Sequence, residues 1–315
     1  MGGNEALLEI VQQKLKMCRI ITMTQKIALQ PCHTIVVGGK QYSHFIISCS
    51  GSDQKYFLKM MKENDCAPHC NDYLRIIRDK NGNCPFPLIL VPDFCFHGVR
   101  YYITTFIDGQ TLDELPKALP AGFWDSIADQ LLLRYDELGT IRSPMYSEHG
   151  SFIAGGYASI FTRKLAEKLR YPGIPLSVKK RNRAFEWCSE ILKTSSFSAP
   201  VLLHMDIKPA NIIYEPRGNT VSLIDFEFAR FGDADYGWTQ LLLSGLNNFS
   251  DIYKHRIVPR MTRNRLTIRD ALDIPKYQCY LFYQLICNFI YYDQRELRSP
   301  EEMTSLFAQL VDQIR

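Results

Sequence analysis

The sequence contains two short stretches whose residue types suit phosphoryl transfer. The first, HMDIKPANIIY, covers residues 204–214, and the second, LIDFEF, covers residues 223–228. Phosphoryl transfer needs a carboxylate that orients the acceptor hydroxyl and oxygen ligands that hold Mg²⁺ against the phosphates. Asp206 and Asn211 share a short loop, and Asp225 follows an apolar strand pattern, where a carboxylate is costly unless a cation or a donor meets it. The two stretches therefore predict one oxygen-lined site at the end of a strand.

The elements that must position this site divide the chain into two parts. Short β-rich runs separated by Gly, Ser and Asp turns fill the first third, with one helical stretch starting at Asn71. Helical periodicity dominates after the stretch DGQTL, and an amphipathic helix with Leu7, Leu8, Val11 and Leu15 on one face opens the chain. The expected strands are residues 34–38, 43–48, 55–60, 85–91 and 100–107; the expected helices are residues 123–138, 158–169, 178–192, 236–246, 275–293 and 301–315. We therefore expect a sheet lobe over residues 1–107 and a helical lobe over residues 108–315.

Composition and charge exclude several classes of protein. The 315 residues are 46% hydrophobic and 22% charged, which is ordinary for a globular chain with a real core. The net charge of +4 is too weak to indicate nucleic acid, and the basic run at residues 179–183 is typical of a solvated helix face. The start of the chain resembles no signal peptide, Ala6 breaks the myristoylation pattern, and no apolar run is long enough to span a bilayer. We expect a cytoplasmic protein that binds neither nucleic acid nor membrane and keeps its cysteines as thiols.

One group of cysteines raises the question of a metal site. Cys66, His69, Cys70 and Cys84 are close in sequence and would make four zinc ligands. Their C-x-x-x-C spacing lacks the matching second pair of a zinc site, so small thiols are the preferred interpretation. The sequence leaves zinc at these residues as an open alternative.

The motifs together resemble the aminoglycoside phosphotransferase and choline kinase group, within the protein-kinase-like fold. The resemblance rests on H-x-D-x-x-x-x-N followed by I-D-F-E, on the hinge-like YYITTFIDGQTL, on CPFPLIL and on FGDADYGW, and the last of these is nearest the hygromycin phosphotransferase branch. It implies an α+β bilobal fold, with a small N-terminal antiparallel sheet lobe that binds nucleotide. The larger, mainly helical C-terminal lobe would carry the catalytic and substrate-binding residues.

The resemblance also implies roles for individual residues. Asp206 would act on the acceptor hydroxyl, Asn211 and Asp225 would hold Mg²⁺, and His204 would brace the loop. Lys59 would reach the α- and β-phosphates of ATP or GTP from the third strand. The nucleotide would also meet Gly38 and Gly39 in the loop over the phosphates and the backbone near Thr105 and Ile107 at the hinge. Lys208 stands where serine/threonine protein kinases carry a lysine that reaches the γ-phosphate, so we count it as catalytic.

Two departures from the family pattern concern charged partners. The helix after the third strand should carry a glutamate for Lys59, but that stretch offers Asn71 and Asp72, and the partner stays unassigned. The last aspartate of the family's G-D-x-x-x-D is replaced by Gly237. We therefore expect no fixed family role for Asp233 or Asp235, one of which suits a helix N-cap better.

The sequence defines the type of reaction more closely than it defines the acceptor. A protein kinase is disfavoured because Asp225 opens DFE rather than DFG and no A-P-E follows; no Walker motif or G-x-S-x-G elbow occurs. The expected acceptor is a small-molecule hydroxyl, most of all on a polycationic aminoglycoside or related antibiotic, so that the chain would confer resistance. Choline, a sugar, or a pseudokinase that only binds nucleotide or acts as a scaffold are the alternatives. Acidic residues that would favour a polycation lie in the last third: Asp251, Asp270, Asp273, Asp293 and Glu296.

Overall fold

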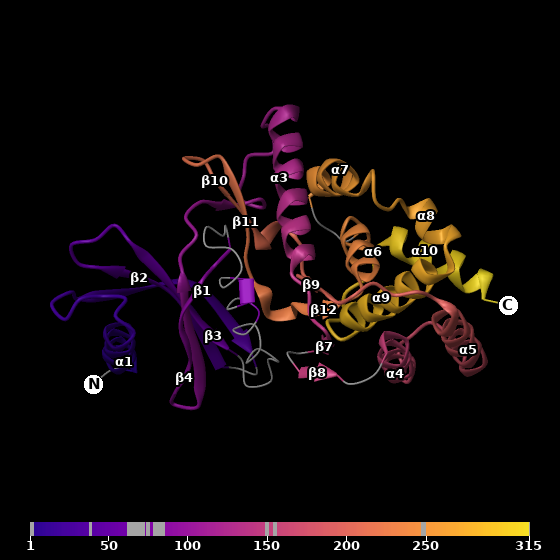
Figure 1. Ribbon diagram of the computed structural model, residues 1–315, viewed down its shortest axis with the longest axis horizontal. Helices are drawn as coiled ribbons and strands as arrows, with labels where there is room; N and C mark the ends of the chain where they lie inside the picture. Colours follow the sequence, from indigo (N-terminus) through magenta and orange to yellow (C-terminus); the bar gives the residue numbers. More distant parts are fainter. Residues whose placement is uncertain are drawn as a thin grey trace.

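The protein divides into a sheet region and a helical region, which lie side by side along its long axis (Figure 1). The structure is a computed structural model and describes residues 3–37, 40–61, 73, 76–77, 86–148, 151–153, 156–246 and 250–314. The helix expected from Asn71 lies largely outside these residues. So do Gly38 and Gly39 and the four candidate zinc ligands Cys66, His69, Cys70 and Cys84.

The N-terminal region is a five-stranded sheet in which neighbouring strands are antiparallel, in the order β1-β2-β3-β5-β4. Helix α1 (Gly3–Met17) packs on it through the buried residues Leu7, Val11 and Leu15, as its amphipathic pattern predicted. The strands are β1 (Ile27–Val37), β2 (Lys40–Cys49), β3 (Lys55–Met61), β4 (Ile89–Phe96) and β5 (Val99–Thr105). Central strand β3 carries Lys59, which pairs in register with Tyr102 of β5.

The sequence prediction of this sheet was wrong at two strands. The first strand begins at Ile27 rather than at residue 34, and the fourth strand is displaced along the chain. We expected residues 85–91, but β4 runs over Ile89–Phe96 and continues through Pro92. Proline normally ends a strand because it lacks a backbone donor, yet an edge strand tolerates it. β4 is such an edge, and its pairing with β5 shifts register between Val91 and Phe94.

The C-terminal region consists mainly of helices, and the six that the sequence predicted are present with ends shifted by at most two residues. They are α3 (Ala121–Thr140), α4 (Tyr157–Leu169), α5 (Val178–Thr194), α6 (Ala234–Ser244), α9 (Pro275–Asp293) and α10 (Glu301–Gln313). The sequence did not predict three shorter helices: η4 (Tyr253–Ile257), α7 (Val258–Thr262) and α8 (Ile268–Asp273). None of the described helices is long and apolar enough to cross a membrane.

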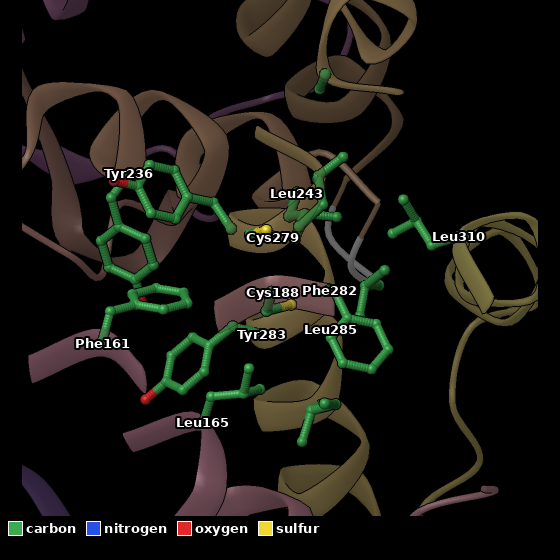
Figure 2. Close-up of a cluster of buried hydrophobic side chains, with 14 of the residues drawn as sticks. Phe161, Leu165, Cys188, Tyr236, Leu243, Cys279, Phe282, Tyr283, Leu285 and Leu310 are labelled. Carbon is green, nitrogen blue, oxygen red and sulfur yellow. The ribbon is translucent and has the colours of Figure 1, made fainter. Parts of the chain in front are cut away.

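The core of the helical region is built around α9, in which residues 279–286 are all buried. Side chains from neighbouring helices converge on it, as Figure 2 shows for Phe161 and Leu165 of α4, Cys188 of α5 and Leu310 of α10. A helix that is buried on every side must be apolar on every side, which explains its run of aromatic and aliphatic residues. The core therefore gives the site a rigid support.

The connection between the two regions is fixed by a glycine. After β5, the chain passes Gly109 and enters the short strand β6 (Gln110–Thr111), which pairs with β10 (Ile212–Glu215) beside β11 (Thr220–Leu223). Gly109 has φ +137°, and a Cβ there would overlap the carbonyl oxygen of Tyr214. Only glycine meets both constraints, since L-residues rarely adopt this φ.

Replacing Gly109 by alanine should destabilise the protein. We expect Gly109→Ala to lower the free energy of unfolding by about 1–3 kcal/mol, through strain at positive φ and the overlap with Tyr214. Gly139→Ala is the matched control, because Gly139 lies in α3 with open space at its Cβ, and there alanine should add about 0.5–1 kcal/mol. Urea unfolding of both variants measures the difference, and equal stabilities would contradict this account of the connection.

Candidate functional site

The candidate site lies where two strand pairs of the helical region end. Strand β9 (Val201–Leu203) leads into the loop that carries Asp206, and the single-turn helix η2 (Pro209–Asn211) follows directly. β11 ends at Leu223, two residues before Asp225, and the Ile224 N–H donates to the Asn211 carbonyl at 3.0 Å. The two loops that the sequence singled out are therefore neighbours, as their motifs predicted.

Asp206, Lys208 and Asn211 form one hydrogen-bonded group. Asn211 Nδ2 donates to both the backbone oxygen and Oδ2 of Asp206, each at 2.8 Å, and Lys208 Nζ lies 2.7 Å from Oδ2. Because the amide nitrogen of Asn211 is directed at Asp206, the amide oxygen is the atom left to act as a metal ligand. Asn211 is buried, whereas the Lys208 side chain is 34% exposed.

Lys59 crosses from the sheet region to the second loop. Its Nζ lies 2.5 Å from Asp225 Oδ1 and 2.6 Å from Glu227 Oε1, and only 12% of the lysine side chain is exposed. Asp225 has the left-handed conformation at φ +67°, which is uncommon for a residue other than glycine, and it directly precedes the three-residue helix η3 (Phe226–Phe228). The expected phosphate-binding lysine and the expected metal ligand therefore meet at one place.

The charges of this ion cluster reinforce each other. Burial alone would lower the pKa of Lys59, but Tyr102 and the carboxylates of Asp225 and Glu227 outweigh burial, so the pKa of Lys59 lies well above its ordinary value. Burial alone would raise the pKa of Asp225, but the Lys59 ammonium outweighs it and the pKa of Asp225 lies below its ordinary value. Both groups are therefore charged at neutral pH.

His204 connects the two loops. It is completely buried, its Nδ1 accepts from the Asp206 N–H at 3.3 Å, and its Nε2 lies 2.8 Å from the Ile224 carbonyl, so Nε2 carries the proton. Its ring packs on Phe226 at a centroid distance of 4.6 Å. Burial holds the pKa of His204 below its ordinary value. The bracing role that we expected for His204 is what these contacts provide.

The hinge offers fewer backbone groups to a nucleotide than we expected. The Thr105 N–H donates to the Leu88 carbonyl at 2.9 Å, and the Thr105 hydroxyl accepts from the Leu88 N–H at 2.9 Å. Thr105 therefore has no N–H left for a base. Ile107 has no hydrogen bond to another described residue, which leaves it as the better candidate of the two.

Asp233 and Asp235 have structural partners. Asp233 is fully buried and caps α6 by accepting from the Asp235 N–H at 2.9 Å, which confirms the N-cap expectation. Lys276 Nζ lies 2.5 Å from Asp235 Oδ2 and 3.5 Å from Asp233 Oδ2. Gly237 is close to Leu203 and to the Tyr135 hydroxyl, which leaves no room for the aspartate of the family pattern.

Several acids of the last third also have local partners rather than a place beside Asp206. Asp270 forms a capping box with Thr267, and Asp293 Oδ2 accepts from the Tyr171 hydroxyl at 2.7 Å. Asp273 lies 3.7 Å from Arg269 on the same helix. With these contacts, the three residues do not come together as an acid-rich pocket.

Sequence analysis missed Glu227 as a site residue. The signal was present in LIDFEF, because Glu227 lies two residues after Asp225, but we treated it only as a departure from DFG. Only the structure shows its carboxylate on Lys59.

The arrangement suits a divalent cation with phosphate ligands. Mg²⁺ is usually held by one or two carboxylates, water and substrate phosphates rather than by a full protein cage. The Asp225 carboxylate and the Asn211 amide oxygen fit this donor set, and no cluster of three or more His, Cys, Asp or Glu side chains suitable for a metal occurs among the described residues. A metal here would therefore depend on the substrate for the rest of its shell.

Comparisons with known proteins agree with this chemistry. Residues 50–254 match the model of a family described as the phosphotransferase enzyme family. No curated protein matches the sequence.

Three solved structures are similar in fold. One is a thermostable mutant of aminoglycoside phosphotransferase APH(4)-Ia in a ternary complex with ADP and hygromycin B (TM-score 0.62, 13% identity, 91% of this chain and 94% of that chain). A putative fructosamine-3-kinase from Haemophilus somnus 129PT has a TM-score of 0.61 at 14% identity, over 96% of both chains. The GDP and kanamycin complex of APH(2")-IIia has a TM-score of 0.57 at 14% identity, over 97% of both chains. These likenesses confirm the bilobal kinase-like fold, and their similar scores do not single out the hygromycin branch.

Protonation of His204 should destabilise the fold. Above the ordinary histidine pKa of about 6.5, His204 is neutral in both the folded and the unfolded protein. Below that pH the unfolded chain binds a proton at His204 more readily than the folded protein does, because the folded pKa is lower. Stability should therefore fall as the pH drops from about 6.5 towards the folded pKa, by at most about 1.4 kcal/mol per pH unit for this group.

The measurement compares urea unfolding of the wild type and His204→Asn at pH 7.5 and 5.5. The variant should be less stable at pH 7.5, because it loses the two loop contacts, but it should lose less stability on acidification. The other histidines act equally in both proteins and cancel. Equal losses would show that His204 does not titrate in this way.

Proposed function

Because the family match spans more than half of the chain, this protein belongs to the phosphotransferase enzyme family, and we propose that it transfers the γ-phosphate of ATP or GTP, with Mg²⁺, to a hydroxyl of a small molecule. The observation that supports this most is the contact between Lys59 and Asp225. It brings a cation from the nucleotide-binding sheet, residues 1–107, to a carboxylate of the catalytic lobe, residues 108–315.

The residues of the two loops supply the parts of the reaction. Asp206 orients the acceptor hydroxyl and accepts its proton, while the hydroxyl oxygen forms a bond to the γ-phosphorus and the bond from that phosphorus to the β-γ bridging oxygen breaks. Lys208, 2.7 Å from Asp206, offsets negative charge on the transferred group. When bound by Asn211 and Asp225, Mg²⁺ neutralises charge on the phosphates.

The nucleotide would occupy the junction between the two regions. Lys59 would contact the α- and β-phosphates, Gly38 and Gly39 would lie over them, and the base would meet the hinge at Ile107 and the carbonyl of Thr105. The neighbours were crystallised with ADP or with GDP, and this supports a purine nucleotide without choosing between them.

The acceptor that we propose is an aminoglycoside or a related antibiotic, which would make the protein a resistance enzyme. Its support is the likeness to enzymes in complex with hygromycin B and with kanamycin. A sugar or another small metabolite such as choline is the second candidate, because the putative fructosamine-3-kinase is nearly as similar in fold. A nucleotide-binding pseudokinase remains the alternative that an assay must eliminate.

The deciding experiment measures ADP and GDP release with Mg-ATP and Mg-GTP against a panel of hygromycin, kanamycin, other antibiotics, choline and simple sugars. Release that depends on one acceptor identifies the substrate class. Nucleotide binding without release on any acceptor would favour the pseudokinase, and absence of both would overturn the proposed function.

Removing the Asp206 carboxylate should abolish transfer but not nucleotide binding. We expect Asp206→Ala and Asp206→Asn to lower acceptor-dependent release by about 10²–10⁴-fold, because general base catalysis is worth that much. Asp136→Ala, which removes a carboxylate 3.2 Å from Arg265 on the surface, is the matched control and should keep wild-type activity. Near wild-type turnover in both Asp206 variants would show that Asp206 is not the base.

Removing Asp225 should weaken the metal-dependent part of nucleotide binding. We expect Asp225→Ala to bind Mg-nucleotide at least about tenfold more weakly, because one carboxylate ligand is lost. Affinity for nucleotide in EDTA should change much less. A loss of the same size with and without Mg²⁺ would contradict a metal role for Asp225.

A further inference from the structure

Lys59 has two carboxylate partners, and in the proposed function Mg²⁺ competes with Lys59 for one of them. Asp225 is within 2.5 Å of its ammonium, yet in the proposed function Asp225 binds Mg²⁺. A carboxylate shared with a divalent cation holds a lysine less firmly, because the two cations repel each other at short range. A lysine that must meet phosphates at a defined place therefore needs a second acid that the metal does not use.

Glu227 is placed to be that acid. Its Oε1 lies 2.6 Å from Lys59 Nζ, and its side chain is 20% exposed, so the pair is shielded from solvent more than a surface ion pair. The pair joins β3 of the sheet to η3 of the helical region. Ion pairs of this kind also hold a long side chain in one rotamer, which lowers the entropy lost when a phosphate binds.

The position of Glu227 is fixed by its neighbours in the loop. Phe226 is 2% exposed and its ring packs on His204 and, edge-on at 5.6 Å, on Phe86. The Ala229 N–H donates to the Phe226 carbonyl at 3.1 Å and closes the turn. Because Phe226 anchors this segment, Asp225 and Glu227 on either side of it have a fixed separation.

The geometry points to Glu227 as the positioning residue for Lys59. When Asp225 binds Mg²⁺, Glu227 keeps the ammonium of Lys59 beside the phosphates. The three-residue segment 225–227 would then position both the lysine and the metal. This inference rests on the proposed function, and it adds a residue and a coupling to it. Glu227 acts through Lys59 and not on the metal or the substrate directly.

The test is a double-mutant cycle on nucleotide binding. Dissociation constants of fluorescent ADP and GDP analogues are measured in EDTA and in saturating Mg²⁺ for wild type, Glu227→Gln, Lys59→Met and the double variant. We expect Glu227→Gln to weaken binding about tenfold in saturating Mg²⁺ and less in EDTA, where Asp225 still holds the lysine. The substitution should have no further effect in either condition once Lys59 is Met, since coupled residues are non-additive. Glu227→Asp, which keeps the charge on a shorter side chain, should recover part of the loss.

Two controls separate positioning from folding. Glu190→Gln breaks the exposed pair with Lys193 on α5 and should leave binding unchanged. Thermal unfolding of Glu227→Gln and Glu227→Asp shows whether a weaker variant is simply less folded; a folded Glu227→Gln with weakened binding supports the inference.

Several outcomes would overturn it. Unchanged or tighter binding in Glu227→Gln would mean that another acid holds Lys59, or that Glu227 mainly repels phosphate. A loss that appears only with Mg²⁺ and persists in Lys59→Met would make Glu227 a metal ligand. Nucleotide binding by the wild type would leave the proposed function intact in each of these cases, whereas a wild type that binds no nucleotide would overturn the proposed function together with the inference.

Discussion

The ion cluster of Lys59, Asp225 and Glu227 is the constraint on which the rest of the site depends. Two carboxylates face one ammonium in a place with little exposure. In the proposed function Mg²⁺ would share Asp225 with Lys59 and would offset the charge of the phosphates. The cluster also fixes how β3 meets the loop after β11.

The loop that carries Asp206 is linked through His204 to the segment that carries Asp225 and Glu227. One ring nitrogen of His204 fixes the backbone of Asp206 and the other fixes the backbone before Asp225. Tyr253 adds a second brace, since its hydroxyl donates to the Ile207 carbonyl at 2.9 Å from inside the core. The carboxylate proposed to act on the acceptor and the carboxylate proposed to bind metal are thus held at a set separation before any ligand arrives. Preorganisation of this kind reduces the reorganisation that a transition state would otherwise require.

The sequence predicted most of this site because its residues lie in short motifs. The loop of Asp206 and Asn211 and the place of Asp225 follow from local spacing, and Lys59 followed from a strand pattern together with the family resemblance. Contacts that depend on tertiary pairing could not be predicted from the sequence. The N–H of Thr105 is taken by Leu88 because β4 is an edge strand that starts late, and Lys59 meets Glu227, which lies 168 positions further along the chain. The Thr105 contact has no local signal, and the Glu227 contact has only the position of Glu227 two residues after Asp225.

The departure at Gly237 shows how the fold and the chemistry are constrained differently. Gly237 meets Tyr135 and Leu203, and Tyr135 in turn packs edge-on against Trp238 at a centroid distance of 4.6 Å, so the space of the family's aspartate is filled by the core. Packing positions of this kind can change together as long as volume is conserved, which is why the fold persists at 13–14% identity. The residues proposed to hold phosphate and metal have no such freedom, because each must supply a particular charge or donor. A kinase-like fold therefore leaves the acceptor undetermined, and side chains outside both the core and the phosphate site must choose it.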